Sequence, residues 1–298
     1  GQIGLAQDEK SVAMDSPKQD SWDGESYTTG RFSFIPRYKA LNMTQSDAQT
    51  IKPESGRTLN KANLERLLAK REPGPDGSAS TLYLRPGEGL EFLESLGSPG
   101  EGWRKRLTRL NDSILDSGTG LAALQSGGRC LVVAPPFPLA ESRLATGWDP
   151  SALLLQLMAE YTLGVVLLRL GRSSVAVYRG ERLLSSKTDA RYVKGKHHAG
   201  GTSQLRFQRI REGQMRKMYD KTCETVHRQF APYAGDFDYI FLGGEKFTLN
   251  GFLKVCPYME QFRSITLGRR LNIRDPKRDT LDQVGGMLHE SRVYQFQW

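Results

Sequence analysis

The distribution of hydrophobic and polar positions divides the chain into three regions. Residues 1–57 contain few large aliphatic side chains and many Asp, Ser, Gln, Lys and Gly residues. That composition predicts a disordered or loosely docked N-terminal arm. Beyond the arm, apolar residues recur at helix or strand spacing. We expect a small α/β accessory or docking domain over 58–149 and a larger domain over 150–298.

In residues 58–149 the apolar spacing alternates between helix and strand. The predicted elements are a helix carrying Leu64, Leu67 and Leu68, a strand at 81–84, a helix from Leu90 that ends near 97–100, an amphipathic helix over 103–115, and a buried strand at 130–134. No catalytic constellation is visible among these residues. The region is therefore interpreted as a platform or docking domain.

The second region begins with three consecutive strand patterns, at 164–170, 173–178 and 182–193. Short turn sequences, Gly171-Arg172 and Arg179-Gly180-Glu181, separate them and predict an antiparallel meander. The later elements are a long helix with apolar positions from Phe207 to Phe230, a strand at 239–242, a helix from Phe247, a strand at 264–267, a helix at 281–288 and a closing strand at 293–296. The pattern predicts an α/β (α+β) fold, with a mixed β-sheet and flanking helices.

Positive charge is concentrated in one short segment. The formal net charge at pH 7 is +9, and residues 187–221 contain ten Lys or Arg against three Asp or Glu, a local balance of +7. Neutralising phosphate groups is a direct source of affinity for nucleic acid. We interpret this segment as an RNA-directed surface.

The basic segment contains a glycine-broken loop, which reads His197-His198-Ala199-Gly200-Gly201-Thr202-Ser203-Gln204. The adjacent glycines let the backbone approach a ligand closely, and the helix start that follows offers bare N–H groups to an anion. Gln204 presents an uncharged amide, which is a poor general base but can orient water, and its backbone N–H can stabilise an oxyanion. The alternative is a flexible surface loop in which Thr202 or Ser203 caps the next helix.

Cysteine spacing and hydropathy bear on three properties: disulfides or zinc, the cellular compartment, and contact with a membrane. Cys130, Cys223 and Cys256 stand far apart with no Cys-x-x-Cys pair, which argues against a disulfide framework and a structural zinc site. A reducing, cytoplasmic setting is the expectation. The apolar stretch 152–170 contains Glu160 and Arg169. It falls short of the roughly 20 apolar residues of a membrane span, so we expect buried core and no membrane partner.

Three blocks around the loop carry a family resemblance. They are Arg191-Tyr192-Val193-Lys194-Gly195-Lys196, Ala199-Gly200-Gly201-Thr202-Ser203-Gln204, and Arg206-Phe207 with Arg209-Ile210-Arg211-Glu212. Together they resemble the Vms-like release factors, a branch of the eukaryotic and archaeal class I peptide-release factor superfamily. Over about 160–298 the order of elements is similar to the superfamily's central domain, which implies an RNase H-like release-factor catalytic domain.

The resemblance implies a function in ribosome-associated quality control. Such proteins act on ribosome-bound peptidyl-tRNA and release the nascent chain from stalled large subunits. The implied catalytic residues are Gly200, Gly201, Ser203 and Gln204, with Gln204 in the place of the glutamine of the Gly-Gly-Gln loop. Thr202 and Ser203 separate Gly201 from Gln204, which matches a Gly-Ser-Gln-like variant and favours rescue over stop-codon termination.

The implied partners are the peptidyl-transferase centre of the large ribosomal subunit and tRNA or peptidyl-tRNA, with no metal and no organic cofactor. The candidate RNA-binding residues are Lys194, Lys196, His197, His198, Arg206, Arg209, Arg211, Arg216 and Lys217. The arginines of the long helix point in different directions around the helix axis. The alternative to RNA binding is that they form a solvated helix face.

Two other functions stay open at this point. One is a ribosome- or tRNA-binding factor without catalysis, and the other is a nuclease that cuts the acceptor end of tRNA. Two-metal cleavage needs carboxylates clustered on the sheet, and the strands at 164–170 and 173–178 contain none. A metal-free cut by His197 or His198 at a 2′-OH is compatible with the sequence.

Overall fold

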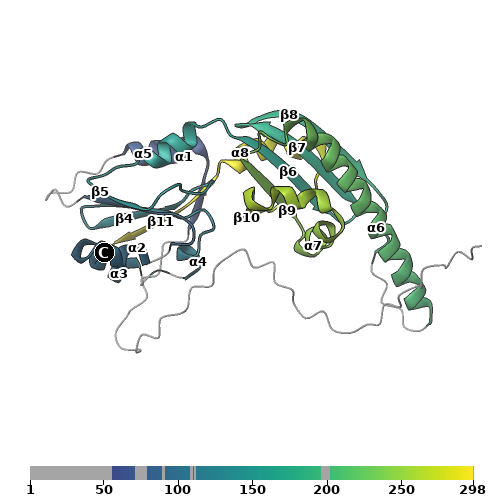
Figure 1. Ribbon diagram of the computed structural model, residues 1–298, viewed down its shortest axis with the longest axis horizontal. Coiled ribbons are helices and arrows are strands. Elements are labelled where there is room, and N and C mark those ends of the chain that lie inside the picture. Colours follow the sequence, from purple (N-terminus) through teal and green to yellow (C-terminus); the bar gives the residue numbers. More distant parts are fainter. Residues whose placement is uncertain are drawn as a thin grey trace, which may run out of the picture. The chain divides into compact units, whose positions relative to one another are not determined.

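The computed structural model describes residues 56–70, 79–88, 91–107, 110, 112–195 and 202–297. Their strands form two sheets, one of six strands and one of five (Figure 1). Most of the predicted arm, 1–57, lies outside the described residues. Among the helices in these ranges, none combines the length and the apolar character that a membrane crossing requires.

The first sheet is antiparallel throughout, in the order β1-β11-β4-β3-β2-β5. Its strands are β1 (Arg57–Leu59), β2 (Ser80–Leu84), β3 (Leu121–Ser126), β4 (Arg129–Ala134), β5 (Arg143–Thr146) and β11 (Ser291–Gln297). The β3–β4 turn contains Gly127 and Gly128 at φ of 56° and 77°. Two left-handed residues in succession are what a tight type I′ hairpin requires, and glycine adopts them without steric cost.

Helices cover both faces of this sheet. They are α1 (Lys61–Ala69), α2 (Glu91–Ser95), α3 (Ser98–Leu107), α4 (Asp112–Leu115) and α5 (Ser151–Met158). On one face Leu93 of α2 and Trp103 of α3 pack with Val132, and on the other Leu64 of α1 and Leu153 of α5 pack near Val133. Neighbouring residues of β4 thus enter opposite cores, as the alternation of a strand requires.

The predicted elements of this region are confirmed except near one helix. The expected helix end near 97–100 is confirmed, because α2 stops at Ser95 and Gly97 has a φ of 65°. The expected start of the next helix at 103 is wrong, because Ser98 and Pro99 open α3. Proline is well tolerated in a first helical turn, where its missing N–H has no intrahelical partner. The expected single helix over 103–115 is also wrong, since α3 ends at Leu107 and a separate short helix, α4, follows.

The second sheet is mixed, as predicted, in the order β10-β9-β6-β7-β8. Its strands are β6 (Thr162–Arg169), β7 (Arg172–Arg179), β8 (Arg182–Ala190), β9 (Tyr239–Gly244) and β10 (Thr266–Leu271). The antiparallel β6–β7–β8 meander is confirmed, and β9 and β10 continue the sheet in parallel on the other side of β6. The central strand, β6, therefore has hydrogen-bonded neighbours on both sides.

Helices enclose the second sheet from both faces. α6 (Thr202–Phe230) and α7 (Lys246–Val255) pack on one face and α8 (Arg278–Leu288) on the other (Figure 1). Val166 and Leu168 of β6 face the α6–α7 core, whereas Val165 and Leu167 face the α8 core. All four are fully buried, which explains why the strand reads as a continuous apolar run.

The last predicted strand lies in a different sheet from the one expected. The alternation at 293–296 predicts a strand that closes the second sheet, but β11 pairs instead with β4 over residues 292–297 and with β1. Val293 enters the core of the first sheet beside Leu131. Alternation of apolar residues requires a buried face but does not specify which sheet provides it.

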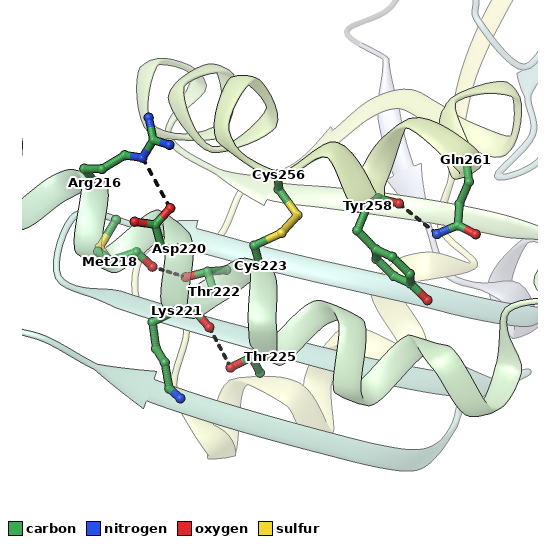
Figure 2. Close-up of a disulfide and its surroundings, with 10 residues drawn as sticks. All are labelled: Arg216, Met218, Asp220, Lys221, Thr222, Cys223, Thr225, Cys256, Tyr258 and Gln261. Atoms are coloured by element: carbon green, nitrogen blue, oxygen red, sulfur yellow. Dashed lines mark hydrogen bonds and ion pairs between the residues drawn. A yellow bond between two sulfur atoms is a disulfide. The ribbon is translucent and has the colours of Figure 1, made fainter. Parts of the chain in front are cut away.

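A disulfide joins Cys223, in the C-terminal half of α6, to Cys256, at the end of α7 (Figure 2). The expectation that the separated cysteines form no disulfide is therefore wrong. The two residues are 33 positions apart in sequence. They meet because α6 and α7 pack together at Gly251, where a side chain would come within 2.7 Å of the Tyr219 hydroxyl. The Tyr219 hydroxyl at this contact is buried, and burial together with the negative charge of Glu245 raises its pKa.

Replacing both Cys223 and Cys256 by Ala should lower the free energy of unfolding by about 2–4 kcal/mol, because the cross-link restricts the unfolded chain. Denaturant unfolding in oxidising and reducing buffer measures this. Reductant should lower the midpoint of the wild-type protein and leave the double variant unchanged. A Cys130→Ala variant, outside the disulfide, should keep the sensitivity to reductant. A wild-type midpoint that is equal in both buffers would contradict the cross-link.

Candidate catalytic loop and nucleic-acid interface

The loop that the sequence singles out joins β8 to α6. Five of its predicted site residues lie outside the described residues: Lys196, His197, His198, Gly200 and Gly201. Ser203 belongs to the first turn of α6, which starts at Thr202. Gln204 lies in the same turn and is exposed to solvent. The predicted catalytic glutamine therefore lies at the start of a helix.

The C-terminal part of α6 is fixed to the second sheet by buried and polar contacts. The Gly171 N–H donates to Met218 Sδ at 3.2 Å, and Thr222 Oγ1 donates to Ser173 Oγ at 3.1 Å. Thr225 Oγ1 donates to a carboxylate oxygen of Asp189 at 2.9 Å. These contacts place the middle of the helix over the β6–β7 turn and the strands beside it.

The N-terminal part of α6 has no such support. From Gln204 onward the first buried side chain is Met215, which is 8% exposed, whereas Leu205 and Ile210 are 61% and 40% exposed. Figure 1 shows this end of α6 continuing beyond the second sheet. Gln204 precedes Met218 by 14 residues, which corresponds to about 21 Å of helix. The helix therefore carries Gln204 well away from the body of the sheet.

The chain entering the loop is attached to the same helix. The Lys194 N–H donates to Gln214 Oε1 at 2.9 Å, and Arg211 Nε donates to the Lys194 carbonyl at 3.2 Å. The Lys194 ammonium lies 4.5 Å from the centroid of the Phe207 ring, a cation–π arrangement. Gln214 and Phe207 were not predicted as site residues. The sequence shows an amide and an aromatic residue on the helix but does not show their partner, because Lys194 lies outside α6.

The predicted basic residues of α6 fall into two groups. Arg206, Arg209 and Lys217 are exposed, and within the described part of the chain their side chains have no hydrogen-bond or ion-pair partner. Arg216 pairs with Asp220 at 3.3 Å (Figure 2), and Arg211 is engaged by Lys194 as described. The first group is open to an external anion, whereas the second also stabilises the helix and the loop entrance.

The bond between Gln214 and the Lys194 amide predicts a local effect. Replacing Gln214 by Leu should destabilise the attachment of the loop entrance by roughly 1 kcal/mol. Hydrogen exchange of the Lys194 amide should accelerate about fivefold, with the global unfolding midpoint nearly unchanged. Gln208→Leu is the matched control, because among the described residues the hydrogen bond of Gln208 goes to Glu212, on its own helix. Equal exchange in the two variants would show that Gln214 does not hold the loop entrance.

Comparison with protein families identifies the segment that contains this site. Residues 161–294 match the family described as Actinobacteria/chloroflexi VLRF1 release factor. The match includes the second sheet, the loop and α6. It confirms the resemblance on which the implied site residues rest, without assigning a role to any of them.

Similar curated proteins are archaeal peptide chain release factor subunits 1. The protein from Methanosphaera stadtmanae is 28% identical over 144 residues, which are 45% of this chain and 35% of that protein. The protein from Archaeoglobus fulgidus is 32% identical over 89 residues, which are 30% of this chain and 22% of that protein. The chain thus spans about a third or less of the length of these relatives.

Two solved structures align with the chain at low identity. The archaeal translation termination factor aRF1 aligns at 17% identity and a TM-score of 0.31, covering 72% of this chain and 66% of that chain. The Vms1 mitochondrial localization core aligns at 10% identity and a TM-score of 0.34, covering 82% of this chain and 91% of that chain.

Proposed function

Over residues 161–294 this chain belongs to the VLRF1-type release factors, within the class I release-factor superfamily, and from that membership we propose that it hydrolyses the ester bond of ribosome-bound peptidyl-tRNA. The observation that carries the proposal is the position of Gln204, exposed in the first turn of a helix that extends beyond its sheet. Such a helix can carry a catalytic loop into a narrow site that the body of the protein cannot enter.

We infer an RNase H-like fold for the second sheet. Its topology supports the inference, because a three-strand antiparallel meander is followed by two parallel strands on the other side of the first strand. Two-metal nuclease chemistry needs clustered carboxylates. β6 and β7 carry no Asp or Glu, and this composition favours the hydrolase over a metal-dependent nuclease.

The proposed chemistry uses a neutral amide and backbone donors. Gln204 orients the attacking water at the ester carbonyl; the bond from that carbonyl to the tRNA oxygen breaks, and the proton that the water loses passes to this oxygen, with the terminal 2′-OH of the tRNA assisting. The backbone N–H of Gln204, together with those of Gly200 and Gly201, stabilises the oxyanion that develops on the carbonyl. Ser203 precedes Gln204 and helps to position it. No residue in this scheme has to change its charge, and the scheme requires no metal or organic cofactor.

The basic residues position this loop on RNA. Arg206, Arg209 and Lys217 are exposed and available to phosphate groups, and contacts of this kind orient a protein without reading sequence. Lys194, Lys196, His197, His198, Arg211 and Arg216 complete the proposed RNA-binding set. The proposed partners are peptidyl-tRNA and the peptidyl-transferase centre of a stalled large subunit, in the cytoplasm.

Replacing Gln204 by Ala removes the amide that orients the attacking water and leaves the backbone N–H in place, and it should lower the rate of peptide release from large subunits by about 100-fold, the effect of losing the position of a reacting group. Binding to the subunits should stay within about twofold, because no charge is lost. Gln208→Ala makes the same chemical change one turn further along α6, and it should retain the wild-type rate. Labelled peptidyl-tRNA on purified large subunits provides the assay.

The products of the same assay separate this function from its alternatives. Free peptide with an intact tRNA end, dependent on Gln204, is the expected result. Peptide still attached to a tRNA fragment would replace the hydrolase with an acceptor-end nuclease. Binding without any product would leave a factor that occupies the site without catalysis. A Gln204→Ala variant that releases peptide at the wild-type rate would overturn the catalytic role of Gln204.

A further inference from the structure

An open cavity of about 450 Å³ lies at one edge of the second sheet. Three arginines line it: Arg169 at the end of β6, Arg172 at the start of β7, and Arg274 in the chain that follows β10. Glu245 and Asp275 are the two acidic residues in its lining. Arginines of the β6–β7 hairpin and of the chain after β10 are thus brought together by the fold.

Two of the three arginine side chains, those of Arg169 and Arg172, are held in place by the protein. Arg169 Nη1 donates to the Arg274 carbonyl at 2.7 Å, and Arg172 Nη1 pairs with Asp275 Oδ1 at 2.6 Å. The fully buried Ser174 donates its hydroxyl to the Pro276 carbonyl at 2.8 Å, which fixes this chain segment to the sheet. Preorganised groups of this kind lose little freedom when a ligand binds.

Internal partners occupy both carboxylates of the cavity. Asp275 pairs with Arg172 and, at 3.1 Å, with Lys277, and Glu245 accepts a hydrogen bond from Thr248 Oγ1 at 2.9 Å. Burial acts to raise the pKa of Asp275, but hydrogen bonds from Lys277 and Arg172 outweigh it and the net shift is downward. Asp275 therefore stays ionised and satisfied without an external cation.

The guanidinium groups, in contrast, retain donors for a ligand. An arginine carries five N–H donors in a planar fork. Within the described residues, the Arg169 side chain makes one hydrogen bond and the Arg274 side chain makes none. The cavity therefore presents more hydrogen-bond donors than the protein itself satisfies. The ligand that matches such donors is an anion with several oxygens.

The cavity lies at the edge of the sheet from which α6 extends. Gly171, which lines the cavity, donates its N–H to Met218 of α6, and the Arg191 N–H donates to the Gly171 carbonyl. About 21 Å of helix separates Met218 from Gln204, with Arg206, Arg209 and Lys217 exposed between them. A polyanion that reaches from Gln204 along α6 therefore arrives at this cavity.

We propose that the cavity lined by Arg169, Arg172 and Arg274 binds a backbone phosphate of RNA. This RNA is either the tRNA whose acceptor end the Gln204 loop contacts or the ribosomal RNA around that end. The proposal rests on the proposed function, which supplies the RNA. The cavity fixes the base of α6 on the RNA while the loop works at its tip. Guanidinium recognition is the same for tRNA and ribosomal RNA, so the two sources are separated by experiment.

The test uses Arg274→Gln, because only the backbone carbonyl of Arg274 takes part in the contact with Arg169. Arg182→Gln is the matched control: Arg182 is exposed at the start of β8, beside the β7–β8 turn and at the opposite end of the strands. Affinity is measured as a function of salt for full-length protein on three probes: deacylated tRNA alone, large subunits without tRNA, and large subunits carrying peptidyl-tRNA.

Arg274→Gln should reduce the slope of log affinity against log salt by about 0.7 to 0.9, the contribution of one phosphate. Affinity should fall about fivefold near physiological salt, and release at saturating protein should stay at the wild-type rate. A reduced slope with tRNA alone assigns the phosphate to tRNA. A reduced slope only with large subunits assigns it to ribosomal RNA.

An unchanged slope on all three probes overturns the proposal, and so does an equal effect of Arg182→Gln, since net charge would then explain the result. Failure of the proposed function is distinguishable from these outcomes. A wild-type protein that releases no peptide, but whose binding depends on Arg274, would refute the hydrolase and leave the cavity as an RNA site.

Discussion

Strand β6 is apolar on both faces, and the second sheet depends on the burial of both faces under helices. Val166 and Leu168 require the cover that α6 and α7 provide, and Val165 and Leu167 require that of α8. Pairing with β7 on one side and β9 on the other satisfies the backbone of the strand. As a consequence, the β6–β7 turn and the ends of β9 and β10 meet at one edge of the sheet.

The candidate site residues of α6 and the arginine cavity are found at that edge because α6 is anchored there. Within the described residues, the buried side chains of α6 begin at Met215, and the disulfide between Cys223 and Cys256 fixes this part of the helix to α7. Short helices are marginal in water unless packing supports them, so the exposed turns around Gln204 depend on the anchored part. The exposed turns can then carry polar and basic side chains, because no core constrains their identity.

Local sequence predicted the elements of the second sheet with little error. The meander of β6, β7 and β8, the long helix and the later strand–helix pairs follow from apolar spacing and from glycine at the turns. The candidate residues near the loop were predicted because glycine, basic residues and Gln204 form a local pattern. The contacts of Gln214 and Phe207 with Lys194, and the cavity that the arginines line, could not be predicted in this way, since they depend on residues from other elements.

The sequence by itself therefore determined the mixed sheet, the order of its elements and the basic loop before α6, all of which depend on short-range spacing and charge. Only the tertiary structure decided that β11 pairs with β4, that Cys223 meets Cys256, and that Arg169, Arg172 and Arg274 share one cavity. The reason is physical. Backbone hydrogen bonds and apolar faces are nearly alike in every strand and helix, so which elements meet is selected by packing of the whole chain.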